Sequence, residues 1–244
     1  MADTETKLVE TLVTANRMLA NENIIDVFGH ISVRSDRNPQ EFLLSCSRSP
    51  QAVTASDIMR YKLDGTPITE TKERHYAERV IHAAILAARP EINSVCHTHS
   101  DAVLPFAVTG EPIRPVIHAG TLFWEGVGWY EKYDAQGNLL VASATEGKEL
   151  AASLGPRRAA VLKNHGAVVV GKSIAAAVLA AIHLEKNART QLEAMRLGKP
   201  MFIEAEEGRR GAAVFDSPLS LERAWGYWLA RLPEGWRHEA GLSN

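Results

Sequence analysis

The feature that most constrains this chain is a strong amphipathic helix pattern that gives way, within a few residues, to a short apolar strand. In residues 73–88 the apolar positions have helical spacing, which predicts a buried stripe of Ala77, Val80, Ile81, Ala84, Ile85 and Ala88. Arg89-Pro90 ends that pattern, and residues 94–98 follow as a strand. A connection this short requires helix and strand to pack as antiparallel neighbours. The chain therefore has to place helix against sheet.

The rest of the chain shows the same alternation of helix and strand patterns, with no repeat of fixed period. Further helices are predicted over residues 5–21, 146–155 and 173–198. Strands are predicted within residues 26–34 and 41–47, and as two segments of 159–171. Such alternation is typical of an α/β protein.

Three stretches have their own signals. Thr54 and Ser56 ahead of Asp57 form a helix-start pattern, and residues 101–130, rich in Gly and Pro, read as loops and strands. From about residue 200 we expect a helical C-terminal extension, which carries Trp225, Trp228 and Trp236. Because no Ser/Gly/Pro linker divides the chain, residues 1–244 are predicted to form a single domain with that extension.

Composition excludes several classes of protein. The 27 Lys and Arg against 29 Asp and Glu give a net charge of −2, so no basic field draws nucleic acid or an anionic membrane. Residues 1–19 are acidic and amphipathic, and no 18 consecutive residues are apolar. Cys46 and Cys96 are too few for a disulfide scaffold and fit a reducing compartment. We therefore expect a cytoplasmic protein that binds neither nucleic acid nor membranes.

The end of the predicted strand carries two histidines, His97 and His99. Side chains two residues apart in a strand project from the same face, so the two rings lie together. Imidazole nitrogens about 3 Å apart suit a transition metal at roughly 2.0–2.1 Å, whereas burying two unpaired imidazoles costs a few kcal/mol. The alternative is a strand end at which both rings face solvent.

Two further residues are candidates for the same site. His165 lies at a sharp break between apolar segments, beside Gly166, which favours an active-site position at a strand end; a simple polar turn is the alternative. Glu78, on the predicted helix, can reach the mouth of the strand or is a solvated helix charge. His82, one turn later, either orients a neighbouring group or caps a buried face.

Together these motifs resemble the class II aldolase/adducin family. The resemblance rests on Glu78 with His82, on HTHS at 97–100 and on NHGAVVVG at 164–171, and it extends to about residue 200. It implies a three-layer αβα sandwich around a mostly antiparallel sheet, usually in a homotetramer with active sites between subunits. It also implies that a divalent metal, zinc or manganese, binds to His97, His99 and His165, with Glu78 as acid/base or displaceable ligand.

The chain departs from the family's sugar-phosphate aldolases at the positions that hold phosphate. His30 stands at the Asn of a Gly-Asn-x-Ser loop that ends here at Ser32, and Arg48-Ser49 stands at a Ser-Gly or Thr-Gly turn. Tyr76-Ala77 replaces a Ser-Ser pair directly before the catalytic Glu. An imidazole, a guanidinium and a phenol suit a flat carboxylated ring better than a phosphate dianion, although Arg48 as a solvent-facing charge is the alternative.

His118, in the segment RPVIHAG, is similar to a loop histidine of a subgroup that decarboxylates hydroxylated aromatic or pyridine carboxylates; a packed loop histidine is the alternative. The leading hypothesis is therefore metal-dependent decarboxylation of an ortho-hydroxylated aromatic carboxylate. Its substrate-binding candidates are His30, Ser32, Arg48, Ser49, Tyr76 and His118. The alternatives are an aldolase or epimerase acting on a small sugar or sugar phosphate, and a non-enzymatic adducin-like module, although such modules have lost the metal ligands.

Overall fold

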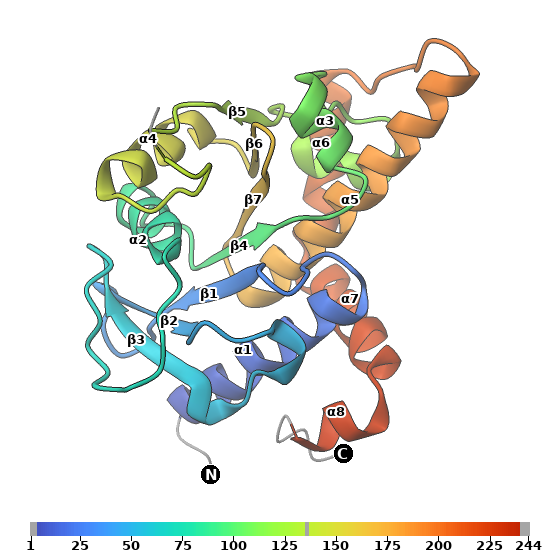
Figure 1. The fold of residues 1–244 in the computed structure, drawn as a ribbon. Coiled ribbons are helices and arrows are strands. Elements are labelled where there is room, and N and C mark those ends of the chain that lie inside the picture. The colour runs from blue at the N-terminus through green and yellow to red at the C-terminus, as the bar shows by residue number, and fades with distance from the viewer. Residues whose placement is uncertain (1–3, 135–136, 240–244) are drawn as a thin grey trace.

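The computed structural model describes residues 4–134 and 137–239 and has a seven-stranded sheet as its middle layer (Figure 1). The strands, in the order β3-β2-β1-β4-β7-β6-β5, are β1 His30–Arg34, β2 Glu41–Ser45, β3 Ile58–Lys62, β4 Ser94–Thr98, β5 Gly128–Tyr130, β6 Ala159–Leu162 and β7 Gly166–Gly171. Every neighbouring pair is antiparallel except β5 and β6, which are parallel. The predicted mostly antiparallel sheet is confirmed.

Helices cover both faces of this sheet. On one face lie α2 Arg79–Ala88 and α4 Ala144–Leu154, packed against each other. On the other lie α1 Thr4–Asn21 and α5 Ile174–Leu197, with α7 Pro218–Arg231 packed against both. The remaining helices are α3 Leu104–Thr109, α6 Ala205–Phe215 and α8 Glu234–Glu239. The three-layer αβα sandwich is therefore confirmed.

The two large hydrophobic cores lie on opposite faces of the sheet, because successive side chains of a strand point to opposite faces. In β4, Cys96 packs in the core beneath α1 and α5, whereas Val95 packs in the core beneath α2 and α4. His97 shares the face of Val95, and it is fully buried at the end of the strand. Within the described residues, no helix has the length and apolar character needed to cross a membrane.

The predicted helix over residues 73–88 begins later, at Arg79. Tertiary hydrogen bonds override helix propensity in residues 74–76, which lie against the residues that follow β2. These bonds run from Ser47 N–H to the Arg74 carbonyl (2.7 Å) and from the Tyr76 hydroxyl to the Arg48 carbonyl (2.5 Å). Ala77 and Ala88 were predicted to be buried but are exposed: Ala77 precedes the shorter helix α2, and Ala88 is its last residue.

Two other stretches also differ from the sequence prediction. The helix-start pattern at Thr54 caps only a single 3₁₀ turn, Ala55–Asp57, because the next residues pair with β2 as strand β3. Within 101–130, helix α3 was not predicted; it has Pro105 in its first turn and ends at Gly110, whose φ of 74° is left-handed. The segment also contains a 3₁₀ stretch, His118–Phe123.

Candidate active site

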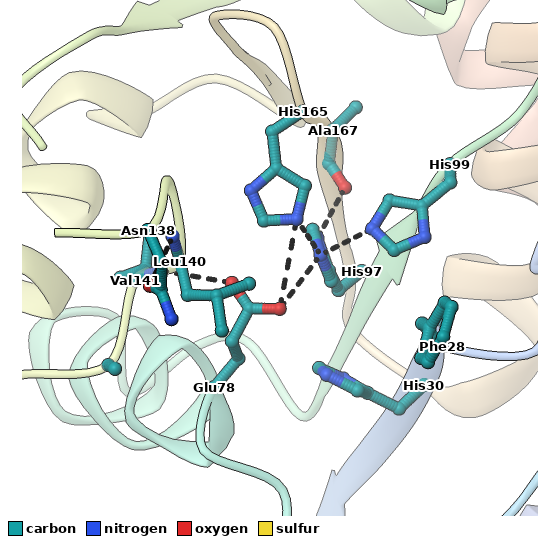
Figure 2. Close-up of polar contacts among 12 residues, drawn as sticks. Phe28, His30, Glu78, His97, His99, Asn138, Leu140, Val141, His165 and Ala167 are labelled. Carbon is teal, nitrogen blue, oxygen red and sulfur yellow. Dashed lines mark hydrogen bonds and ion pairs between the residues drawn. The ribbon is translucent and has the colours of Figure 1, made fainter.

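The site forms where β4, β7 and the start of α2 meet (Figure 2). His97 lies near the end of β4 and His99 just beyond it, while His165 occupies the turn between β6 and β7. Antiparallel pairing sets Thr98 opposite Ala167, so these two strand ends are adjacent. The turn depends on Asn164, which has the left-handed φ of 56° that Asn tolerates better than most residues.

The three imidazoles direct the same ring atom to one point. His97 Nε2 lies 3.0 Å from His99 Nε2 and 3.3 Å from His165 Nε2. The three potential ligand atoms all lie within 4.8 Å of one another. Figure 2 shows the rings converging from the two strand ends. The sequence-predicted ligands His97, His99 and His165 are thus brought together.

In His97 and His99, the hydrogen bond made by Nδ1 determines which ring nitrogen carries the proton. His97 Nδ1 donates to the Ala167 carbonyl at 3.1 Å, and His99 Nδ1 donates to an Asp26 carboxylate oxygen at 2.9 Å. Because a carbonyl or carboxylate oxygen only accepts, Nε2 of each ring carries a lone pair. Lone pairs that face each other at this distance repel unless a cation lies between them. The residues therefore fit a divalent metal, and three ligands leave coordination positions open to substrate.

Burial favours the neutral, metal-binding form of His99 and His165. Burial, followed by the nearby His97 ring, lowers the pKa of His165 to about 4. The pKa of His99 is also lowered, mainly by burial, although Asp26 acts in the opposite direction. Neutral imidazole is the metal-binding species, so protons compete weakly for these ligands at neutral pH.

Glu78 completes the cluster from the start of α2. It is the N-cap of this helix, not a residue of the helix body as predicted, because the helix begins only at Arg79. Its Oε2 lies 3.5 Å from His97 Nε2 and 3.8 Å from His165 Nε2, and its Oε1 accepts from Val141 N–H at 3.1 Å. Burial raises its pKa, but these neighbours outweigh burial and hold the pKa at about 2. Glu78 is thus an ionised carboxylate beside the imidazole nitrogens.

An open cleft of about 760 Å³ adjoins the cluster, a size that accommodates a substituted aromatic ring. Glu78, His99 and His165 line it together with three of the predicted substrate residues, Arg48, Ser49 and Tyr76. Exposed apolar side chains also line the cleft, among them Val27, Phe28 and Leu139.

The other predicted substrate residues lie differently. His30 is buried beside the cleft, with its ring centroid 4.4 Å from that of Tyr76 and 5.2 Å from that of His97. Ser32 lies deeper, and its hydroxyl contacts His82 Nδ1 at 2.7 Å. His118 is exposed and packs against Phe215 of α6 at 4.9 Å, away from the cleft lining of its own chain. The structure therefore does not bring His118 to this site.

Sequence reasoning missed Asp26, which holds His99. Its carboxylate also accepts from the backbone N–H groups of Phe28 (2.9 Å) and Gly29 (3.0 Å), so it closes the turn that leads into β1. An Asp three residues before a Gly is the available signal for such a turn. The segment Asn138–Leu140, which also lines the cleft, had no comparable signal.

Gly166 → Ala is expected to destabilise the protein. A Cβ at Gly166 would overlap the Thr98 carbonyl oxygen and lie 2.8 Å from Cδ2 of His99, so both the strand pairing and a metal ligand would shift. We expect a loss of about 1–3 kcal/mol in the free energy of unfolding, measured in urea. The control is Gly226 → Ala in α7, where a Cβ meets nothing within 4 Å. Equal stability of the two variants would contradict this packing.

Proteins that are similar to this chain in sequence and proteins that are similar in structure point to the same family. The Class II Aldolase and Adducin N-terminal domain matches residues 10–192. The chain is 27% identical over 252 residues to the decarboxylase tropJ of Talaromyces stipitatus, spanning 93% of this chain and 94% of that protein. It is 30% identical over 242 residues to the 3,4-dihydroxyphthalate decarboxylase of Arthrobacter keyseri, with the same two shares of 93% and 94%.

Solved structures with a similar fold include class II aldolases. The L-fuculose 1-phosphate aldolase from Glaciozyma antarctica superposes with a TM-score of 0.80 at 26% identity, covering 98% of this chain and 94% of that chain. An aldolase II superfamily protein from Pseudomonas syringae, at 24% identity, shares the fold with a TM-score of 0.81 over 95% of this chain and 94% of that chain. The family predicted from the sequence motifs is thus confirmed: the chain belongs to the class II aldolase and adducin N-terminal domain family.

Proposed function

We propose that this enzyme, a lyase of the class II aldolase family, decarboxylates a hydroxylated aromatic carboxylate with the help of a divalent metal. The observation that carries the proposal is the convergence of three imidazoles beside a cleft lined by Arg48 and Tyr76. The relatives named as decarboxylases support this reaction type. An interaction module has no need of three converging imidazoles, two of them held in one tautomer by hydrogen bonds to Nδ1, and so the cluster favours catalysis.

His97, His99 and His165 would hold the cation. When bound, the cation withdraws electron density from the substrate oxygens as the carbon–carbon bond breaks. Imidazole ligands suit zinc and manganese alike, and the identity of the metal depends on geometry and availability.

Arg48 is the residue best placed to hold a substrate carboxylate. Its Nε contacts an Asp57 carboxylate oxygen at 3.2 Å, which fixes the side chain, while the guanidinium lines the cleft with 42% of the side chain exposed. Glu73 lies 3.8 Å from Nη2, a loose contact that an incoming carboxylate can replace. The rings of Tyr76 and His30, at 4.4 Å and inclined by 51°, provide a nearby aromatic surface for a flat substrate.

Glu78 supplies the proton transfers. Its ionised Oε2 accepts the proton of a ring hydroxyl, and the carbon–carbon bond then breaks with its electron pair left on the ring carbon. Carbon dioxide leaves, Glu78 gives the proton to that carbon, and the ring oxygen regains a proton from solvent. The Val141 N–H, donating to Oε1, keeps Oε2 directed toward the imidazole cluster throughout.

The test is an assay of purified, metal-loaded protein against hydroxybenzoates and hydroxyphthalates. We expect release of carbon dioxide from a substrate with a hydroxyl ortho to the carboxylate. The competing function is an aldolase or epimerase of a small sugar or sugar phosphate, which the structural likeness to L-fuculose 1-phosphate aldolase favours. Aldehyde release from a sugar phosphate, with no carbon dioxide from any aromatic acid, would support that function instead.

Arg48 → Ala is expected to raise KM for the aromatic carboxylate by about 10- to 100-fold, because a hydrogen bond to a charged group contributes roughly 1.5–3 kcal/mol. Arg48 → Lys should recover only part of this, since an ammonium lacks the planar fork. Steady-state kinetics on both variants measures the effect. An unchanged KM in Arg48 → Ala would mean that Arg48 pairs with Asp57 but does not bind the substrate carboxylate.

We further propose that residues 1–244 form one domain that assembles as a cytoplasmic homotetramer with active sites between subunits. Large apolar side chains near the end of α5 support an interface there, since Leu197 is 93% exposed and Met201 is 91% exposed. Analytical ultracentrifugation would give the mass in solution, and a monomer at micromolar concentration would refute the assembly.

A further inference from the structure

A row of buried polar side chains runs behind the candidate active site and contributes no ligand to it. His82 of α2 is fully buried, and its Nε2 lies 2.7 Å from His30 Nδ1. Its Nδ1 lies 2.7 Å from the Ser32 hydroxyl. Ser32 and His30 are both in β1, two residues apart on the same face, so the ring of His82 bridges them. The row therefore extends from the core to the ring of His30 beside the cleft.

The direction of these hydrogen bonds can be derived from a backbone carbonyl. The Val95 carbonyl accepts from the His82 ring, and Val95 is the Cα partner of Ser32 in the neighbouring strand. The nitrogen facing Ser32 and Val95 is thus Nδ1, and it must carry the proton because a carbonyl only accepts. In the neutral ring, His82 Nε2 is then an acceptor, and so the proton in its bond to His30 belongs to His30 Nδ1.

This assignment leaves His30 Nε2 with a lone pair. Among the described residues no hydrogen bond engages that atom, whereas both nitrogens of His82 are engaged. The His30 ring packs against Tyr76, which lines the cleft, and it pairs across the sheet with His97. Figure 2 shows His30 below the histidine cluster. Among the described residues, the fully buried side-chain atoms that lack a partner do not include His30 Nε2, so this atom keeps some exposure, and its ring lies against Tyr76 of the cleft lining.

We propose that His82 is a positioning residue that fixes His30 as a hydrogen-bond acceptor, and that His30 Nε2 accepts from a second ring hydroxyl of the substrate, distinct from the hydroxyl whose proton Glu78 takes. This inference rests on the proposed function for its substrate and names the feature that the site selects, a hydroxyl donor on the aromatic ring. A substrate with a methoxy group at that position has no proton to donate and would leave the His30 lone pair buried and unpaired.

A packing role alone does not account for the row. The ring of His82 lies 6.3 Å from that of Phe42 and nearly parallel to it, at 18°, so a phenyl ring would fill the same space. Burying two imidazoles and a hydroxyl costs free energy unless each polar group has a hydrogen-bond partner. A chain of three polar groups that ends in an open acceptor next to the cleft-lining Tyr76 can bind a polar group of the substrate.

The first experiment observes the tautomer directly. Zinc-loaded protein with ¹⁵N-labelled histidine would be studied by magic-angle-spinning NMR, with the His30 signals assigned through His30 → Asn. We expect a protonated Nδ1 and an unprotonated Nε2 in the wild type, and a mixture of tautomers in His82 → Phe. His82 → Gln offers an acceptor oxygen to His30 Nδ1 and should restore the wild-type tautomer. A proton on His30 Nε2 in the wild type would overturn the proposal.

The second experiment compares binding of 2,3-dihydroxybenzoate and 2-hydroxy-3-methoxybenzoate by calorimetry, so that the hydroxyl assigned to Glu78 is present in both compounds. We expect the wild type to bind the dihydroxy compound more tightly than the methoxy compound. In His82 → Phe this preference should fall by about 3- to 10-fold, which corresponds to the loss of one neutral hydrogen bond. His183 → Phe in α5, where the ring hydrogen-bonds the Leu179 carbonyl of the same helix, is the matched control and should keep the preference. An unchanged preference in His82 → Phe would overturn the proposal. Absence of decarboxylation would refute only the proposed function, because neither experiment requires turnover.

Discussion

Replacement of one imidazole of the cluster is expected to remove the bound metal and nearly all activity. In His165 → Asn, only His97 and His99 would remain as imidazole ligands. Loss of several kcal/mol of transition-state stabilisation corresponds to a fall in kcat/KM of about 10³-fold or more. Metal per chain, measured by mass spectrometry after dialysis, and kcat/KM would be determined on the same samples.

His165 is the suitable position because it lies in a turn and its replacement leaves the strand core intact. His97 → Ala gives a second test at a fully buried position, where circular dichroism must first show a folded chain. The control is His183 → Asn, which lies in the layer on the other side of the sheet. Stoichiometric metal retained in His165 → Asn would contradict the role of the triad.

Glu78 → Gln is expected to lower kcat by about 10²- to 10⁴-fold while the metal is retained. The amide keeps the shape of the side chain and an oxygen that can accept from Val141 N–H, but it cannot take up a proton as the ionised carboxylate does. Steady-state kinetics and metal analysis measure the two effects separately. Glu146 → Gln, another buried carboxylate that accepts from backbone N–H groups, controls for charge loss at a buried site.

Two outcomes would assign Glu78 differently. Activity within a few fold of the wild type would exclude proton transfer by this carboxylate. Loss of the metal together with activity would make Glu78 a ligand, as its distance of 3.5 Å from His97 Nε2 allows after a small movement.

The arrangement of the histidines follows from the sequence because it depends on local geometry. The two-residue period of a strand places His97 and His99 together, and His165 is found from the break in an otherwise apolar run. Their convergence required the pairing of β4 with β7, which spans some 70 residues of sequence and has no local signal. The resemblance to a known family supplied that step.

The errors share a physical cause, because each concerns a segment whose conformation tertiary contacts decide. Residues 74–76 have helix-forming neighbours but lie outside the helix, held by bonds to the residues after β2. Thr54 has a good capping pattern, yet the strand pairing that begins at Ile58 limits it to one 3₁₀ turn. His118 is a different case, because its substrate role stays a prediction from the resemblance; in its own chain the ring packs against Phe215 of α6, a contact that the sequence around His118 does not encode.

The most direct test of the central claim is the coordination of zinc in the loaded protein, observed by X-ray absorption at the zinc edge and by anomalous diffraction. We predict one zinc per chain bound by Nε2 of His97, His99 and His165 at about 2.0–2.1 Å, with the remaining positions occupied by solvent or substrate oxygens. A zinc ion with no imidazole ligand, or electron density that places it away from these three rings, would contradict it.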